Sequence, residues 1–195
     1  MCGRWSGACE QTGSSADPVS GYAALLRGVN VSGHRKIAMA DLRDLLTGLG
    51  FADVRTLLQS GNATFSADGT DAAALEGLLE ATLLERLDLT TRVLVRTGDD
   101  LRSVMAAHPF AAKADNGSKM VALFLSANPA PEVAAEHDPR VLDPENIAVG
   151  DRVVYQWCPD GISNAPVLGP WLERRWKVAV TGRNWNTVGK LAALL

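Results

Sequence analysis

The feature that most constrains the fold is the order of the apolar segments, which occurs twice along the chain. A short apolar run at 22–28 predicts a buried strand, and an apolar stripe at helical spacing over 39–49 predicts a helix. The runs "VRTLLQ" and "NATFSA", joined at Ser60-Gly61, predict a hairpin. A helix over 72–87 and a strand at 91–97 complete the order strand, helix, strand, strand, helix, strand.

After a connecting helix near 99–107, the same order recurs in the second half. "MVALFLS" predicts a strand, 131–136 a short helix, "ENIAVGDRVVYQWC" a hairpin, 166–176 a helix and "KVAVTG" a strand. We therefore expect an α+β fold of two tandem ferredoxin-like (split βαβ) subdomains with a C-terminal helix. The expected boundaries are a flexible tail over 1–20, a first subdomain over 21–108, and a second over 119–195 that includes the terminal helix.

Composition and charge narrow the class of protein. Lys and Arg number 19 against 22 Asp and Glu, a formal net charge of -3 that argues against a nucleic-acid partner. No apolar run approaches the roughly 20 residues needed to span a bilayer, so no membrane partner is expected. The three cysteines, at 2, 9 and 158, match neither a disulfide framework nor a zinc spacing. We expect a cytoplasmic protein without metal or cofactor.

Three polar loops are expected to lie near one another. In a split βαβ unit, the loop after the first strand and the hairpin between the second and third emerge at one edge of the sheet. This makes "RGVNVSGHRK" and "QSGN" neighbours. The last strand of the second unit leads into "TGRNWNT", so edge-to-edge packing of the halves would let all three loops line one cleft.

These three loops also carry a resemblance. The segments "ALLRGVNVSGHRKIAMADLRDLLTGLGF", "VRTLLQSGNATF" and "GRNWNTVGKLAALL" resemble the bacterial family catalogued as domain of unknown function 1697, DUF1697. Its members carry ALLRGINVGG, QSGN and TRNWNTV motifs in this order, and the match runs from about Tyr22 to Leu195. The resemblance implies two ferredoxin-like subdomains and brings no assigned activity.

The first loop has the composition of an anion site. Arg27, Arg35, Lys36 and His34 surround backbone that Gly28 and Gly33 leave accessible, so the loop can offer N–H groups and cations to phosphate or carboxylate. A solvated surface loop with glycines at its turns explains the same residues. His34 is the outside candidate for a catalytic acid or base, against an ordinary solvated histidine.

The other two loops have structural explanations as well as functional ones. Hairpin geometry accounts for Ser60-Gly61-Asn62 without a nucleophile, although Gln59 and Asn62 can still hydrogen-bond a ligand. Asn184 or Asn186 can cap the terminal helix. That leaves Arg183 beside the helix N-terminus, where it can hold an anion or pair with a neighbouring carboxylate.

Together these observations favour a protein that binds a small anionic or phosphorylated metabolite, with or without transforming it, in a cleft between the subdomains. Whether it is an enzyme is left open, and so is its oligomeric state. The expected ligand-binding residues are Arg27, Gly28, Asn30, Gly33, Lys36, Gln59, Ser60, Asn62, Arg183, Asn184, Asn186 and Thr187.

Two alternatives remain. One is an RNA-binding module, which needs exposed aromatics on the central strands, where only Tyr22 and Phe65 are available. The other is a protein-interaction domain whose polar loops merely hold the two halves together.

Overall fold

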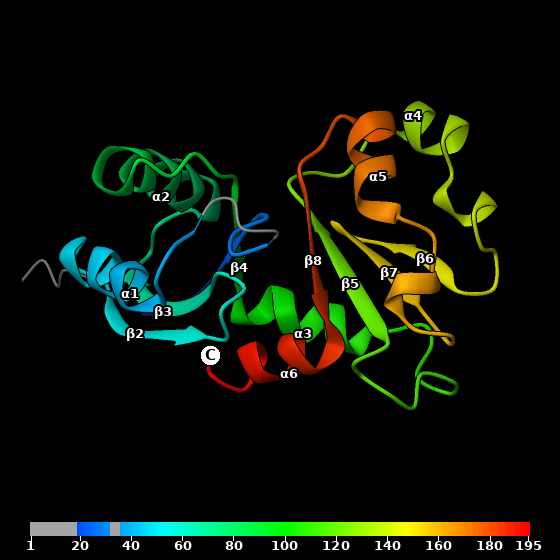
Figure 1. Cartoon of the computed structure of the whole chain (residues 1–195), viewed down its shortest axis with the longest axis horizontal. Coiled ribbons are helices and arrows are strands. Elements are labelled where there is room, and N and C mark those ends of the chain that lie inside the picture. Colours follow the sequence, from blue (N-terminus) through cyan, green and yellow to red (C-terminus); the bar gives the residue numbers. More distant parts are fainter. Residues whose placement is uncertain (1–18, 32–35) are drawn as a thin grey trace, which may run out of the picture.

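The computed structural model describes residues 19–31 and 36–195. It is an α+β fold with two four-stranded antiparallel sheets, in the orders β2-β3-β1-β4 and β6-β7-β5-β8 (Figure 1). Both sheets place the third strand of their half beside the first, and the fourth on its other side. The two halves therefore share one strand order.

The N-terminal half comprises β1 (Val19–Leu26), α1 (Met39–Gly48), β2 (Ala52–Leu57), β3 (Asn62–Asp68), α2 (Ala72–Leu87), β4 (Val93–Thr97) and α3 (Gly98–Ala106). The C-terminal half comprises β5 (Met120–Leu125), α4 (Pro131–Glu136), η1 (Pro139–Val141), β6 (Ile147–Gly150), β7 (Val153–Trp157), η2 (Ile162–Asn164), α5 (Leu168–Trp176), β8 (Val180–Asn184) and α6 (Trp185–Ala192). The first strand begins at Val19, inside the segment predicted as tail, because its first residues pair with the end of β3.

Side chains alternate across β1 and divide the interior of the N-terminal half. Tyr22, Ala24 and Leu26 pack under α1 and α2, against residues such as Leu42 and Leu79. The intervening Ala23 and Leu25 point to the opposite face, toward the C-terminal half. This period of two lets one short strand contribute to two cores.

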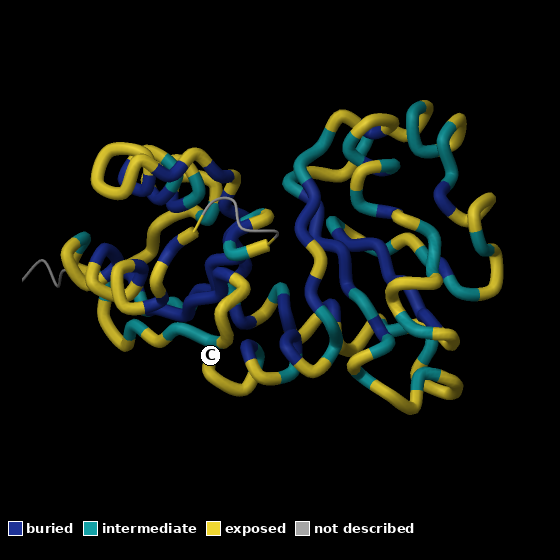
Figure 2. Tube along the Cα trace, viewed as in Figure 1, coloured by how far each residue is buried: buried dark blue, intermediate teal, exposed yellow. Residues whose placement is uncertain are grey.

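The second of these cores is shared by both halves. It joins Leu25 of the first sheet to Phe124 and Tyr155 of the second, through Leu101 of α3 and Leu191 of α6. Helices α3 and α6 lie side by side beneath the two sheets (Figure 1), and the tube in Figure 2 is dark blue, hence buried, where they meet. The halves are thus packed together through apolar side chains as well as through their loops.

The two halves repeat the same main-chain contacts at corresponding positions. Leu26 at the end of β1 donates its N–H to Gly61 O at 2.8 Å, and Leu125 at the end of β5 donates to Arg152 O at 3.0 Å. Each of these leucines pairs with the first residue of the last strand, Leu26 with Val93 and Leu125 with Val180. The correspondence assigns every position in β4 a counterpart in β8.

Gly61 occupies a turn that no larger residue fits. Its φ is +70°, and an added Cβ would lie 2.3 Å from Val29 Cγ2 and 2.9 Å from Leu26 Cβ. We expect Gly61→Ala to lower the free energy of unfolding by more than about 2 kcal/mol, since strain and overpacking add. Gly50→Ala is the control, because Gly50 has φ +87° with no heavy atom within 4 Å of its added Cβ. Chemical denaturation of both variants checks this, and equal losses would contradict the packing argument.

Candidate functional site between the halves

Arg183 of β8 crosses from the C-terminal half into the N-terminal half. Its Nε donates to Asn62 Oδ1, and its Nη2 donates to Leu26 O at 2.8 Å, Ser60 O at 3.2 Å and Gly61 O at 3.3 Å. Its Nη1 donates to Thr181 Oγ1 at 2.8 Å and Gly182 O at 2.9 Å. A guanidinium has five N–H groups, so this set of acceptors uses all of them.

Burial is the reason these contacts matter. Arg183 is 7% exposed, and desolvation lowers its pKa to about 10, so the side chain stays charged at neutral pH. Its partners are neutral oxygens rather than the carboxylate considered from the sequence. The three polar loops do meet here, yet they meet through Arg183 itself, whose donors are already engaged.

The residues after Arg183 belong mainly to the start of α6. Asn184 accepts hydrogen bonds from Thr187 N at 3.0 Å and from Thr187 Oγ1 at 2.8 Å, so Asn184 is the N-cap. Thr187 is buried, whereas Asn186 is exposed. Of the two asparagines left open by the sequence, Asn184 performs the capping.

The first loop is held to the hairpin by Asn30. Its Nδ2 donates to Ile37 O at 2.9 Å and to Gln59 O at 2.7 Å, and its Oδ1 accepts from Ile37 N at 3.0 Å. Gly28 and Lys36 are exposed. The predicted residues Gly33 and His34 lie outside the described residues.

The hairpin residues are similarly engaged with the protein. Asn62 is fully buried, and its Nδ2 donates to Leu57 O at 3.0 Å and to Ser60 Oγ at 2.9 Å. Gln59 and Ser60 are exposed at the tip of the hairpin. Asn62 therefore connects the hairpin to Arg183.

Arg27 lies at the outer mouth of the junction between the halves. Its Nη2 contacts Glu173 Oε2 of α5 at 2.6 Å, and the Arg27 side chain remains 35% exposed. Arg27 and Arg92 both line an open hollow of about 520 Å³. Because Arg92 is paired with Glu80 at 2.9 Å, both arginines at this hollow already have a carboxylate partner.

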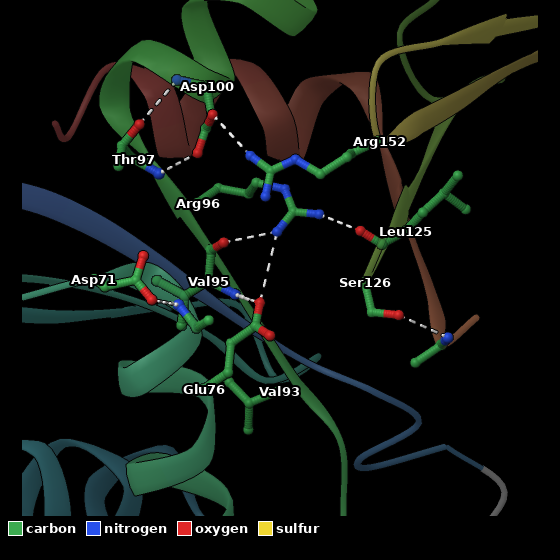
Figure 3. Close-up of polar contacts among 12 residues, drawn as sticks. Asp71, Glu76, Val93, Val95, Arg96, Thr97, Asp100, Leu125, Ser126 and Arg152 are labelled. Carbon is green, nitrogen blue, oxygen red and sulfur yellow. Dashed lines mark hydrogen bonds and ion pairs between the residues drawn. The ribbon is translucent and has the colours of Figure 1, made fainter. Parts of the chain in front are cut away.

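Arg96 of β4 is the counterpart of Arg183, as the matching strand registers require. It is 2% exposed; its Nη1 donates to Val95 O at 2.7 Å and its Nη2 donates to Leu125 O across the junction. These two carbonyls correspond to Gly182 O and Leu26 O at Arg183. A carboxylate oxygen of Glu76 lies 3.7 Å from Nη1 and completes the contacts that Figure 3 draws for this guanidinium.

The two buried arginines differ in whether the neighbouring hairpin supplies a hydrogen-bond acceptor for Nε. At Arg183, Asn62 Oδ1 accepts from Nε. The register places Val153 at the corresponding position, and its apolar side chain has no acceptor. Within the described parts of the chain, no hydrogen bond from Arg96 Nε is found, so Arg96 keeps donor capacity that Arg183 does not have.

Beside Arg96 is a pocket of about 190 Å³ between the halves, and Arg152 from the β6–β7 turn lies next to it (Figure 3). Arg152 Nη2 contacts Asp100 Oδ1 of α3 at 3.1 Å. Burial, and then the positive charge of Arg152, lower the pKa of Arg96 to about 10. The lining residues are Arg96, Asp100, Ser103, Val104, Ala107, Asp151, Arg152 and Tyr155.

Arg152 adopts a backbone conformation that favours glycine. Its φ is +50°, and its counterpart in the N-terminal hairpin is Gly61, with φ +70°. A left-handed conformation in a residue with a side chain costs about 1 kcal/mol or more and is typical of tight turns between antiparallel strands. Arg152 adopts it in the short turn between β6 and β7.

Tyr155 is a buried residue of the pocket lining. Its hydroxyl donates to Val104 O at 2.8 Å, and burial raises its pKa to about 12. Because the folded-state pKa lies above the unfolded value near 10, we expect its contribution to stability to be complete below about pH 10 and to be lost as the pH rises toward 12. Alkaline titration of phenolate absorbance and unfolding curves, each compared with Tyr155→Phe, measure this; an unchanged alkaline stability profile in the variant would contradict it.

Sequence reasoning missed this pocket. Arg96 stands within the apolar run "TRVLVRT", and a charged residue in such a run was the available signal. Asp100, Arg152 and Tyr155 come from three other elements, and nothing in their spacing brings them together.

The comparisons with known proteins agree with this fold. The family model described as "Protein of unknown function (DUF1697)" matches residues 19–155. The solved structure of the conserved bacterial protein SP0830 from Streptococcus pneumoniae is similar, with a TM-score of 0.65 and 21% sequence identity. That match covers 91% of this chain and 99% of SP0830.

A search of curated proteins finds no match. Among the described residues, no helix combines the length and apolar character needed to cross a membrane. The resemblance stated from the three loop motifs is confirmed by the family match, which spans more than half of the sequence. The chain belongs to the DUF1697 family of proteins of unknown function.

Proposed function

We propose that this protein binds a small molecule with an anionic oxygen group in the pocket between its halves, at Arg96 and Arg152. One observation supports this most directly. Arg96 is 2% exposed yet donates to only two carbonyl oxygens, whereas its counterpart Arg183 uses every N–H group. Arg96 Nε is not among the enclosed unpaired atoms of the described residues, so solvent reaches it, and a ligand oxygen can take the place of water there with a charge-assisted hydrogen bond.

The size of the pocket limits the ligand. Sites for drug-sized molecules have volumes of roughly 300–1,000 Å³, and this pocket has about 190 Å³. A small carboxylate or phosphate group fits such a volume, while a nucleotide does not. The proposal therefore keeps the anionic metabolite expected from the sequence and moves its main contact from Arg183 to Arg96.

The residues predicted from the sequence receive a supporting role in this proposal. Arg183 and Asn62 hold the hairpin to the C-terminal half, and Asn30 holds the first loop to the hairpin, so they maintain the junction in which the pocket lies. Arg27 is a peripheral contact beside Glu173. We also propose that each half is a ferredoxin-like unit, supported by the shared strand order, and that the protein acts in the cytoplasm.

Of the two alternatives, RNA binding has less support. Tyr22 and Phe65, the aromatics such a platform would use, are 4% and 1% exposed and lie under α1 and α2. A protein-interaction role accounts for the contact of Arg96 with Leu125 O across the junction, but it gives no role to the pocket beside Arg96 or to its remaining donors.

Thermal unfolding with added phosphate or acetate tests the proposal. At about 100 times its dissociation constant, a ligand adds roughly 2.7 kcal/mol. We expect the wild type and Arg27→Met to be stabilised equally, and Arg152→Met to lose the stabilisation while remaining folded. Stabilisation lost in Arg27→Met and kept in Arg152→Met would move the site to the outer hollow. Absence of any shift would overturn the proposal.

A further inference from the structure

We infer that the ligand of the Arg96–Arg152 pocket is a small zwitterion, a free α-amino acid, with its carboxylate at the arginines and its ammonium at Asp151. The inference rests on the proposed function and specifies the ligand class. It starts from the presence of both signs of charge in one small pocket, which Arg96, Arg152, Asp100 and Asp151 all line.

The two carboxylates differ in how far they are already occupied. Asp100 Oδ2 accepts from Thr97 N at 3.0 Å in the capping box of α3, and its Oδ1 accepts from Arg152 at 3.1 Å. Asp151 Oδ1 accepts from Asn128 Nδ2 at 2.7 Å. Within the described residues, no donor is found for Asp151 Oδ2, so Asp151 is the carboxylate that retains an acceptor for a ligand.

The two arginines of the pocket also retain unused hydrogen-bonding groups. Arg152 spends one Nη on Asp100, and Arg96 spends one N–H on each of Val95 O and Leu125 O. Between them they retain several N–H donors near the pocket. A carboxylate accepts in a planar, two-oxygen geometry that guanidinium groups match well.

Charge balance argues for a zwitterion over a simple anion. Two arginines and two aspartates line the pocket, and Glu76 lies directly behind Arg96. An added anion would make the local charge more negative, and like charges repel. A zwitterion adds no net charge and places each of its groups beside the opposite sign.

Apart from Ser103, the rest of the lining is apolar. Val104, Ala107 and the ring of Tyr155 form the remaining wall, and the Tyr155 hydroxyl is already bonded to Val104 O. This wall suits a short aliphatic side chain. Together with the volume of about 190 Å³, it favours amino acids of the size of alanine or valine over larger ones.

Calorimetric titration of the full chain with matched probes tests the inference. Alanine and valine carry both charged groups. Acetate carries only the carboxylate, and methylammonium carries only the ammonium. We expect the amino acid to bind at least about tenfold more tightly than either single-group probe, because each probe leaves one charged partner unmet. The isosteric Asp151→Asn should lose about tenfold in amino-acid affinity and leave acetate affinity equal or higher. Arg152→Met should weaken both.

Each other outcome has a distinct meaning. If acetate or phosphate binds and the amino acid binds no tighter, the proposed function stands and the zwitterion is overturned. If Asp151→Asn weakens every probe alike, Asp151 acts only through Asn128, and the zwitterion is again overturned. If no probe binds the wild type, both the inference and the proposed function fail.

Discussion

Replacing Arg183 by methionine is expected to lower the free energy of unfolding by at least about 3 kcal/mol. The variant keeps an unbranched apolar stem but leaves Asn62 Oδ1 and the buried carbonyl of Leu26 without the guanidinium donor, while Gly61 O keeps its bond from Leu26 N. Each buried acceptor without a partner costs about 1–3 kcal/mol. For a chain of this size, the melting temperature should fall by at least roughly 6 °C.

Arg174→Met is the matched control, because Arg174 lies on the exposed side of α5. Its effect should stay within about 0.5 kcal/mol. A double-mutant cycle with Asn62→Ala adds a direct measure of the contact and should give a coupling energy of about 1 kcal/mol or more. Similar stability of Arg183→Met and Arg174→Met would show that the buried guanidinium is not what joins the loops.

The second large effect is expected in the core that both halves share. Phe124 is 0% exposed and packs in the cluster that includes Leu25 of the first sheet and Leu191 of α6. Phe124→Ala should lower the free energy of unfolding by about 3–5 kcal/mol, as large cavities in packed cores do. The half-buried Phe110 provides the control, whose truncation to alanine should cost clearly less.

Amide hydrogen exchange tells whether the core couples the halves. We expect Phe124→Ala to reduce protection in β1 and β4 as well as in β5 and β7, because its cluster includes residues of both sheets. Loss of protection confined to the C-terminal half would contradict a shared core and indicate that the halves unfold independently.

Secondary structure could be predicted from the sequence more directly than the contacts between segments. The strands and helices followed from the spacing of apolar residues, because a period of two or of 3.6 is set within one segment. The neighbourhood of the three polar loops followed from strand topology, which the two antiparallel sheets support. Asn184 as the N-cap was one of two local choices, and the backbone at α6 selected it.

The roles of the arginines did not follow in the same way. Arg27 and Arg183 looked equivalent in the sequence as polar loop residues, but one is half-exposed beside Glu173 and the other is buried with all donors used. Arg96 looked like part of a strand. Its free donor capacity depends on Val153 standing where the other hairpin has Asn62, and this comparison needs the register of both sheets.

By itself, the sequence determined the α+β class, the repeated order of the elements and the family, because these depend on local periodicity and on contiguous motifs. The tertiary structure decided which charged residues are buried and which retain unused hydrogen-bonding groups. Burial and hydrogen-bond satisfaction depend on contacts between segments far apart in the chain, such as the contact of Arg96 with Leu125 O across the junction. The pocket at Arg96 and Arg152 arises from that packing.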